Sequence, residues 1–383
     1  MTAQRKGLIV AAISIVLVFS ALLPAWSMDN ENPVTFDVIL RWLGVDVGVG
    51  YRGLALLPGA DTIFWAYAGG GYEWMNFYRD TSGALLGRGS IPADTNTTFV
   101  RYEGAWRLGM EQGFTWNERT KTNGFEAFAF YRGRYDVNED SQVQMLIDTP
   151  VSLLPDKAGS LMNTLQFGLA YDDLLFDAKH KTKNGFSAEA SAEWGPGFLF
   201  NAIVGNADYV RFNAKARGFI PLYDAAPDHA GNLFSVYAGE YVAVDYSAGL
   251  NGAPVPLFIR QTLGGREQKT GLGHAARGVD TAAYDTNFKA VNSLEVRANL
   301  PALYFSDLVP GIVVFFDAGY YAQVGEGLPS PVPSGFTAST GAGVYIDVFD
   351  LGSLALYFDY RLDGTNADGT NFSAFVLEFG MHF

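Results

Sequence analysis

The chain has 383 residues, no cysteine, 44 glycines and a formal net charge of −14, and only 17% of its residues are charged. With 49% hydrophobic and 15% aromatic residues it is too apolar to be disordered, and without cysteine it cannot be a disulfide scaffold. Its acidic balance argues against a nucleic-acid partner.

The N-terminal residues have the features of a secretory signal peptide. Arg5 and Lys6 form a positive start, an apolar run covers residues 7–23, and residues 25–27 (Ala-Trp-Ser) form a small-x-small cleavage site. This predicts a signal peptide at 1–27 and a single exported domain at 28–383. A retained N-terminal membrane anchor is the alternative, which the shortness of the apolar run and Pro24 disfavour.

After residue 27 the apolar residues alternate with polar ones and form no second run near the ~20 residues of a membrane helix. Such alternation predicts strands with two unlike faces. Thirteen strands are predicted, at residues 45–57, 62–78, 97–116, 124–137, 163–173, 185–197, 207–222, 232–249, 288–300, 309–322, 335–349, 353–363 and 371–383. Because single-chain barrels have an even number of strands, we expect another at 34–43 or 142–153.

The placement of charges favours a membrane barrel over a soluble β-sandwich, which would also alternate. Arg211, Asn213, Lys215 and Arg217 share one face of a strand whose other face is apolar. A packed core cannot hold such charges unpaired, whereas a wet lumen can. The predicted fold class is therefore all-β, a transmembrane antiparallel β-barrel of about 14 to 16 strands.

The longest stretch without alternation in the second half contains residues 263–280, LGGREQKTGLGHAARGVD. A structureless loop of this length usually has a function. The stretch resembles the inward-folded loop of the BamA/TamA superfamily of outer-membrane assembly factors, which carries (L/G)GG followed by Arg-Gly-aromatic. The residues Leu263-Gly264-Gly265 and Arg277-Gly278 match this pattern, and Val279 replaces the aromatic residue.

Four further stretches resemble the same superfamily and follow in its order. They are residues 169–185, SLEVR at 293–297, FFDAG at 315–319, and the chain end at 372–383. The last of these resembles a terminal recognition signal, with Phe379, Met381 and Phe383 on one face.

The resemblance implies that Arg277 reaches into the barrel and pairs with Glu295 and Asp317. Alternation independently places the two acids on the inner face of adjacent strands, where an arginine fork can bridge them. Gly278 would permit a tight turn beside the arginine. The alternative is that Arg277 is an ordinary exposed charge of the loop, the role we expect for Arg266, and that the acids line a wet pore.

The resemblance further implies a barrel of the bacterial outer membrane that inserts or translocates proteins, or lipid, by opening the seam between its first and last strands. Its partners would be outer-membrane lipid, client outer-membrane or exported proteins, and periplasmic accessory factors. About seventeen residues separate the cleavage site from Val45, which predicts a chain without the superfamily's periplasmic POTRA domains.

The seam is predicted between residues 371–383 and either 45–57 or 34–43, and Gly48, Gly50, Gly53 and Gly380 would weaken it. We expect no enzymatic activity, cofactor or metal, since the four histidines, at 180, 229, 274 and 382, lack metal-ligand spacing. Two alternatives remain open at this stage, a passive diffusion channel and an outer-membrane hydrolase.

Overall fold

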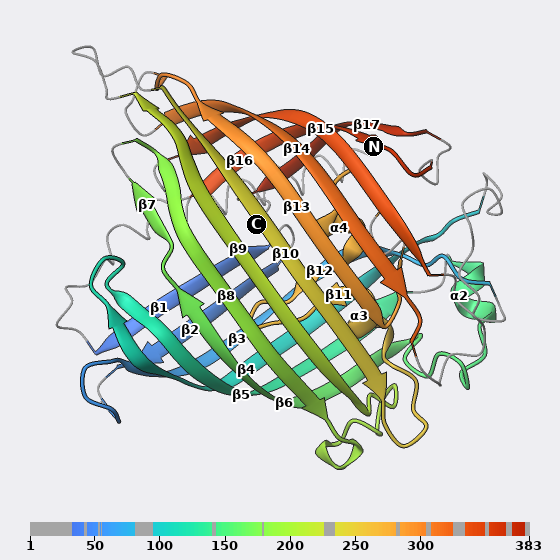
Figure 1. Ribbon diagram of the computed structural model, residues 1–383. Coiled ribbons are helices and arrows are strands. Elements are labelled where there is room, and N and C mark those ends of the chain that lie inside the picture. Colours follow the sequence, from blue (N-terminus) through green and yellow to red (C-terminus); the bar gives the residue numbers. More distant parts are fainter. Residues whose placement is uncertain are drawn as a thin grey trace.

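A single large antiparallel sheet makes up most of the structure (Figure 1). The computed structural model describes residues 33–41, 44–52, 54, 56–80, 95–139, 143–177, 180–225, 234–280, 284–303, 308–324, 334–348, 352–364 and 370–379. The predicted signal peptide at 1–27 lies outside these residues.

In the described part of the chain the sheet has 15 strands, of which 14 are joined in sequence order from β1 to β17, and β7 pairs with β8 alone. All thirteen predicted strands are present, and β1 is the expected additional one at 34–43. The strands on the path are β1 (Val34–Arg41), β2 (Gly44–Tyr51), β3 (Thr62–Asn76), β4 (Thr98–Asn117), β5 (Thr122–Glu139), β6 (Gly159–Asp172), β8 (Thr182–Gly195), β9 (Tyr209–Ala225), β10 (Phe234–Gly249), β13 (Phe288–Asn299), β14 (Leu308–Ala322), β15 (Gly335–Val348), β16 (Gly352–Arg361) and β17 (Phe372–Phe379). The short strand β7 covers Leu175–Asp177.

The other candidate for a missed strand, residues 142–153, was wrong, because this segment contains the helix α2 (Gln144–Asp148). Val143 and Leu146 are three residues apart, a helical spacing, and both are buried in a cluster with Met75 and Phe77. The other described helical segments are η3 (Gly197–Leu199), α3 (Leu257–Arg260) and α4 (Leu272–Ala275). No helix in the described ranges is long and apolar enough to cross a membrane.

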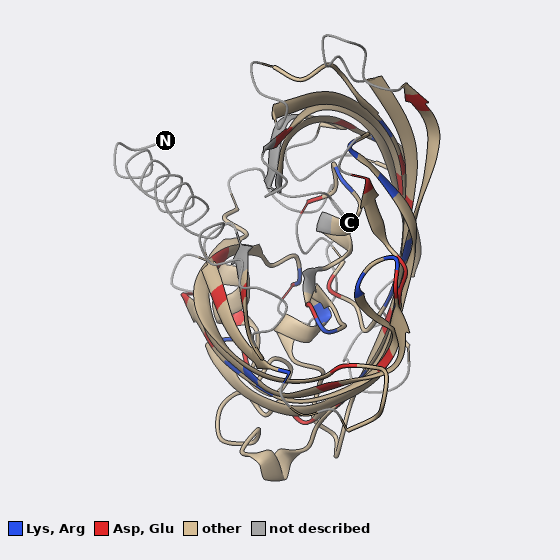
Figure 2. Ribbon diagram, turned by 90° about the vertical axis from the view of Figure 1, so that its left-hand side faces the viewer, with Lys and Arg blue, Asp and Glu red and all other residues tan. Residues whose placement is uncertain are grey.

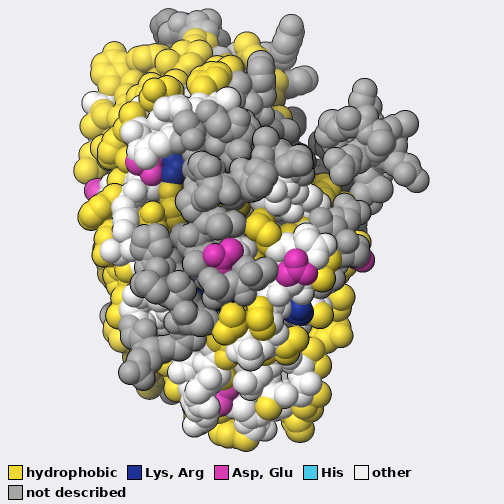
Figure 3. All heavy atoms as spheres, turned by 90° about the vertical axis from the view of Figure 1, so that its right-hand side faces the viewer, with side chains coloured by type: hydrophobic (Ala, Val, Ile, Leu, Met, Phe, Trp, Pro, Cys, Tyr) yellow, Lys and Arg dark blue, Asp and Glu magenta, His cyan; other side chains and the backbone are white. Residues whose placement is uncertain are grey.

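The sheet curls round an interior (Figure 2), and the connection between β10 and β13, which contains α3 and α4 (Figure 1), packs against inward-facing side chains of the sheet. On β13 the inward side chains Ser293, Glu295 and Arg297 are buried, whereas the outward Leu294 is exposed. The outward faces of β14 and β9 expose Val314 and Phe212 in the same way. In Figure 3 hydrophobic side chains gather at the top and along the margins of the view, as expected for the outer surface of a barrel that faces lipid.

The hydrogen-bonded path through the described strands begins at β1 and ends at β17, so these are the two edges of the sheet. The predicted weakness at the seam needs correction, because Gly48 and Gly50 lie on β2, the second strand. Rings of β3 cover both positions. A Cβ on Gly48 would collide with the ring of Tyr67, and one on Gly50 would lie 2.8 Å from the ring of Trp65.

Several predictions about the two edges fall partly or wholly outside the described residues. Gly53, Gly380, Met381 and Phe383 all lie there, and Phe379 is the last residue of β17. The backbone pairing of β16 with β17 shifts register between Tyr357 and Phe358.

The long antiparallel ladders predict the behaviour of the purified protein on detergent gels. We expect unboiled protein to migrate faster than boiled protein, because backbone groups paired along the whole curled sheet resist unravelling in detergent. Circular dichroism should show mainly β-structure. Equal migration of the two samples, or a mainly helical spectrum, would contradict the barrel.

Candidate functional site: the inner loop and its anchors

The connection between β10 and β13, residues 250–287, is called the inner loop below. It contains α3, a two-stranded hairpin of β11 (Thr262–Leu263) and β12 (Lys269–Thr270), and α4. Leu263 and Leu272 of the loop are buried against Phe219, Tyr241 and other wall residues that point inward from the sheet. The loop is therefore a folded structure packed on the inner wall.

Arg277 lies at the centre of a buried ion-pair cluster. Its Nε and Nη2 donate to the two carboxylate oxygens of Asp317 on β14 at 2.8 and 2.9 Å, and its Nη1 donates to Glu295 on β13 at 3.1 Å. The backbone N–H of Arg277 also donates to Asp317, at 2.9 Å. Arg297 of β13 donates to Glu295 at 2.6 Å, so that carboxylate is held from two sides.

Aromatic rings and opposite charges keep this arginine charged in the interior. The guanidinium carbon lies 3.7 Å from the centre of the Phe315 ring and 5.2 Å from that of Tyr357. Burial alone would lower the pKa of Arg277, but the hydrogen bonds and negative charge of Asp317 outweigh it, so the pKa lies above its usual value. Arg277 therefore stays charged and keeps its ion pairs with Asp317 and Glu295.

The two residues after Arg277 show how the loop approaches the wall. Gly278 has a φ of +77°, and a Cβ there would lie 2.7 Å from Asp359 of β16, so only glycine fits without displacement. Val279, where the related motif has an aromatic residue, packs with Ala276 and Tyr78. An aromatic ring is thus present beside the motif, but it comes from the segment that follows β3.

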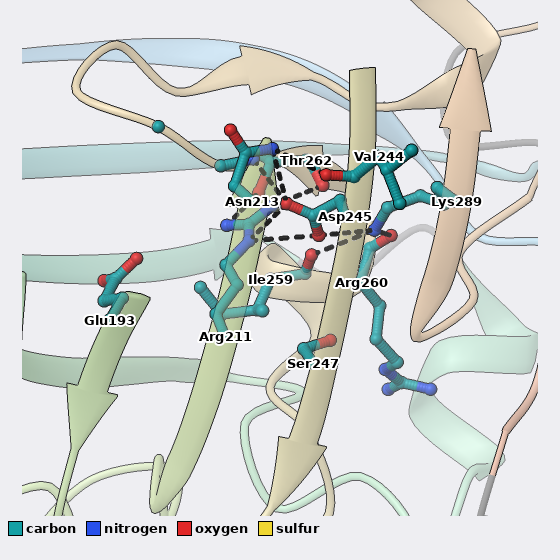
Figure 4. A network of polar contacts seen from close by, with 12 residues as sticks. Glu193, Arg211, Asn213, Val244, Asp245, Ser247, Ile259, Arg260, Thr262 and Lys289 are labelled. Carbon is teal, nitrogen blue, oxygen red and sulfur yellow. Dashed lines mark hydrogen bonds and ion pairs between the residues drawn. The ribbon is translucent and has the colours of Figure 1, made fainter. Parts of the chain in front are cut away.

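A second anchor holds the start of the hairpin at Thr262 and Gly264, where Arg211 and Asp245 of the wall meet the loop (Figure 4). Asp245 of β10 accepts from Arg211 of β9 at 2.9 Å and from the backbone N–H of Gly264 at 2.7 Å. Arg211 also donates to the carbonyl oxygen of Thr262, at 2.6 Å. A Cβ on Gly264 would lie 2.8 Å from Nε of Arg211, so glycine is required here for close approach.

Lys289 completes this network from β13. It is fully buried, and its Nζ donates to the carbonyl oxygens of Arg260 at 2.7 Å and Thr286 at 3.1 Å, and lies 3.8 Å from Asp245. Both carbonyl groups belong to the inner loop. The loop therefore contacts charged side chains of β9, β10 and β13.

These residues correct the expectation that the charges on β9 face a wet lumen. Arg211 and Asn213 are buried under the loop, and each donates to Asp245. Alternation placed them on the correct face, but the partner Asp245 is 34 residues further along the chain. No sequence signal connected the two, and Lys289 was missed for the same reason.

The expectation for Arg266 was wrong as well. Instead of an exposed loop charge, it donates to Glu111 of β4 and Glu189 of β8, each at 3.1 Å, and to Glu126 of β5. Arg266 is therefore a second anchored arginine of the loop.

A third buried arginine ties the end of the loop to the segment after β3. Arg79 donates from Nε to both carboxylate oxygens of Asp285 at 2.9 and 3.0 Å, and from Nη2 to its carbonyl oxygen at 2.8 Å. Sequence reasoning missed this pair because neither residue belongs to an alternating segment.

The described side chains form a packed and anchored loop more clearly than a reactive centre. Within the described ranges, no three His, Cys, Asp or Glu side chains are grouped so that they could hold a metal ion. His180 contacts Asp177 at 2.8 Å, but Ser235 directs its hydroxyl to the backbone oxygen of His180 and not to the ring. That geometry does not activate a serine nucleophile.

The fold and these anchors together define a class of protein, an antiparallel β-barrel with an arginine-anchored loop folded into its interior. The family model of the Omp85 superfamily domain matches residues 88–383, which is well over half of the chain. The chain therefore belongs to the Omp85 superfamily, in agreement with its resemblance to the BamA/TamA proteins. No curated protein matches its sequence.

Replacing Arg277 with alanine should release the loop from the wall. Asp317 would keep only a backbone N–H, so we expect the loop to be destabilised by about 3 kcal/mol, within the range for breaking a buried ion pair. A cysteine at Ala275, which is buried in the wild type, would report this as maleimide labelling on the order of 100-fold faster.

Arg119→Ala provides the matched control, since Arg119 is an exposed arginine whose pair with Asp173 lies outside the loop. Labelling at equal rates in the Arg277 and Arg119 variants would show that the Arg277 cluster does not hold the loop.

Proposed function

We propose that this protein is an outer-membrane barrel that assists the insertion or translocation of other polypeptides, or of lipid, by opening laterally between β1 and β17. Membership of the Omp85 superfamily supports the general assignment to outer-membrane insertion and translocation barrels. In this proposal no covalent bond is made or broken, and the partners are outer-membrane lipid and client proteins.

The observation that carries the proposal is the contrast between a firmly held interior and two edges that end the hydrogen-bonded path. The inner loop is fixed by the buried charge pair of Arg277 with Asp317 and by the hydrogen bond from the N–H of Gly264 to Asp245. In the described part of the sheet, by contrast, the path of paired strands stops at β1 and β17. Exposed strand edges are reactive because their backbone groups can pair with another strand, which is what an entering client would supply.

The same interior supports this proposal over a passive diffusion channel. A general pore needs a water-filled lumen, whereas the inner loop packs Leu257, Ile259 and Leu272 into buried positions inside the sheet. In planar bilayers we therefore expect small, irregular current steps and not the steady conductance of a porin.

A reversible cross-link across the seam tests the mechanism directly. The chain has no cysteine, so one cysteine on β1 and one on β17 would form a unique disulfide where their Cβ atoms lie ~3.5 to 4.5 Å apart. We expect oxidised protein in lipid vesicles to lose its ability to accelerate insertion of an unfolded barrel protein, and reduction to restore it.

The matched control is a disulfide between two strands that need not separate. Val296 of β13 and Val314 of β14 face each other in register, so Val296→Cys with Val314→Cys should cross-link without loss of activity. Full activity of the oxidised β1–β17 protein would refute lateral opening, and steady conductance in both redox states would favour the diffusion channel.

A further inference from the structure

We infer that the inner loop connects the two edges of the sheet across the interior, and that Arg266 is the anchor on the β1 side that releases when the seam opens. This inference rests on the proposed function and adds to it the means by which the interior controls the seam. It follows from three sets of contacts, which run from Arg266 to the wall, from there to β1, and from Arg277 towards β17.

The first set attaches Arg266 to the N-terminal half of the sheet. Its guanidinium contacts Glu111, Glu126 and Glu189, and its backbone N–H donates to Glu189 at 2.6 Å. Arg132 of β5 donates to the carbonyl oxygen of the preceding Gly265 at 2.8 Å. The tip of the hairpin is thus held by β4, β5 and β8, through both side chain and backbone.

The second set leads from Arg266 to the edge strand. Arg107 of β4 donates to the carbonyl oxygen of Arg266 at 2.8 Å, and its guanidinium lies 3.9 Å from the centre of the Tyr67 ring. Tyr67, on β3, donates its hydroxyl to Asp37 of β1 at 3.1 Å. Trp65, also on β3, donates to Glu111 at 2.8 Å. A continuous line of polar and cation–π contacts therefore joins the loop to β1.

The third set reaches the strand that neighbours the opposite edge. Gly278 packs against Asp359, and Arg277 lies near the ring of Tyr357. Both wall residues belong to β16, which pairs along its length with β17. Arg361 of β16 also donates to the hydroxyl of Tyr284 at the end of the loop.

The two anchors differ in their access to solvent, and this difference sets the order of release. The side chain of Arg277 is 3% exposed and its carboxylate partners are fully buried. The side chain of Arg266 is 24% exposed and those of Glu111 and Glu126 are 14% and 13% exposed. Water and salt weaken exposed pairs far more than buried ones, so Arg266 should release while Arg277 stays in place.

The distance between the edges is the quantity to measure. Phe36 of β1 and Phe372 of β17 have exposed side chains, so spin labels on cysteines at both positions would leave the interior intact. We expect pulsed electron paramagnetic resonance to give one narrow distance distribution for the labelled, otherwise wild-type protein in lipid. Arg266→Gln should add a second population at longer distance, and Arg119→Gln, the control, should not.

Salt provides an independent readout. Raising the ionic strength to 1 M should produce the longer population in the wild type and change little in Arg266→Gln, because the anchor that salt screens is then already absent. An unchanged distance distribution in Arg266→Gln, with the protein still heat-modifiable on gels, would overturn the inference. So would a salt effect of equal size in both proteins.

If Arg266→Gln does not fold, Tyr67→Phe decides, since it removes only the hydroxyl that reaches Asp37. It should also add the longer population, and no change would overturn the connection to β1.

The insertion assay on the same proteins separates this inference from the proposed function. Active insertion without any distance change refutes the inference alone, and a distance change in a protein without insertion activity refutes the proposed function alone.

Discussion

The structure depends on how charged side chains are accommodated inside a curled sheet. Alternation along each strand places Glu295, Asp317, Asp245 and Lys289 on the inner face, where each is fully buried or nearly so. A buried charge without a partner is costly, and these side chains find partners largely on the inner loop. The loop supplies the guanidinium of Arg277, an N–H to Asp245 and carbonyl oxygens to Lys289. Wall and loop therefore stabilise each other. Removing the loop would take the guanidinium of Arg277 from Asp317, whereas Glu295 and Asp245 would keep the wall residues Arg297 and Arg211.

The sequence predicted the features that repeat and those that lie close together along the chain. Alternation located the strands and showed that Glu295 and Asp317 face inward, because side-chain direction in a strand follows from period two alone. The fourteenth strand was correctly expected at 34–43, whereas Val143 and Leu146 follow a helical spacing that the apolar content of 142–153 obscured. The pairing of Arg277 with Glu295 and Asp317 was predicted from the loop motif and not from the alternation.

Contacts across the interior could not be predicted in this way. Arg266 is 155 residues from Glu111 and 77 from Glu189, and alternation says only that each acid faces inward, not which others it meets. The same limit explains why Arg211 was wrongly expected to face a wet lumen. Alternation placed it on the inner face of the sheet, but gave no sign that the inner loop covers it. Tyr78 is the clearest example of a contact that the sequence could not predict. The loop motif lacks its aromatic residue, but the ring of Tyr78, from a distant segment of the chain, packs beside Val279.

The two halves of the loop motif now have a common physical explanation. Each combines an arginine with a glycine that lets the backbone approach a crowded wall, Gly265 at a φ of +114° before Arg266 and Gly278 at +77° after Arg277. Between the two arginines the chain is folded. It contains β12 and α4, β12 pairs with β11 on the other side of Arg266, and the N–H of Gly271 donates to the carbonyl oxygen of Gln261 at 2.8 Å. A folded connector of fixed length transmits displacement from one wall to the other, whereas a flexible one would absorb it by changing its own conformation. In the proposed coupling, anchors at both ends of this folded segment link the two walls, whereas a single anchored arginine would hold one wall alone.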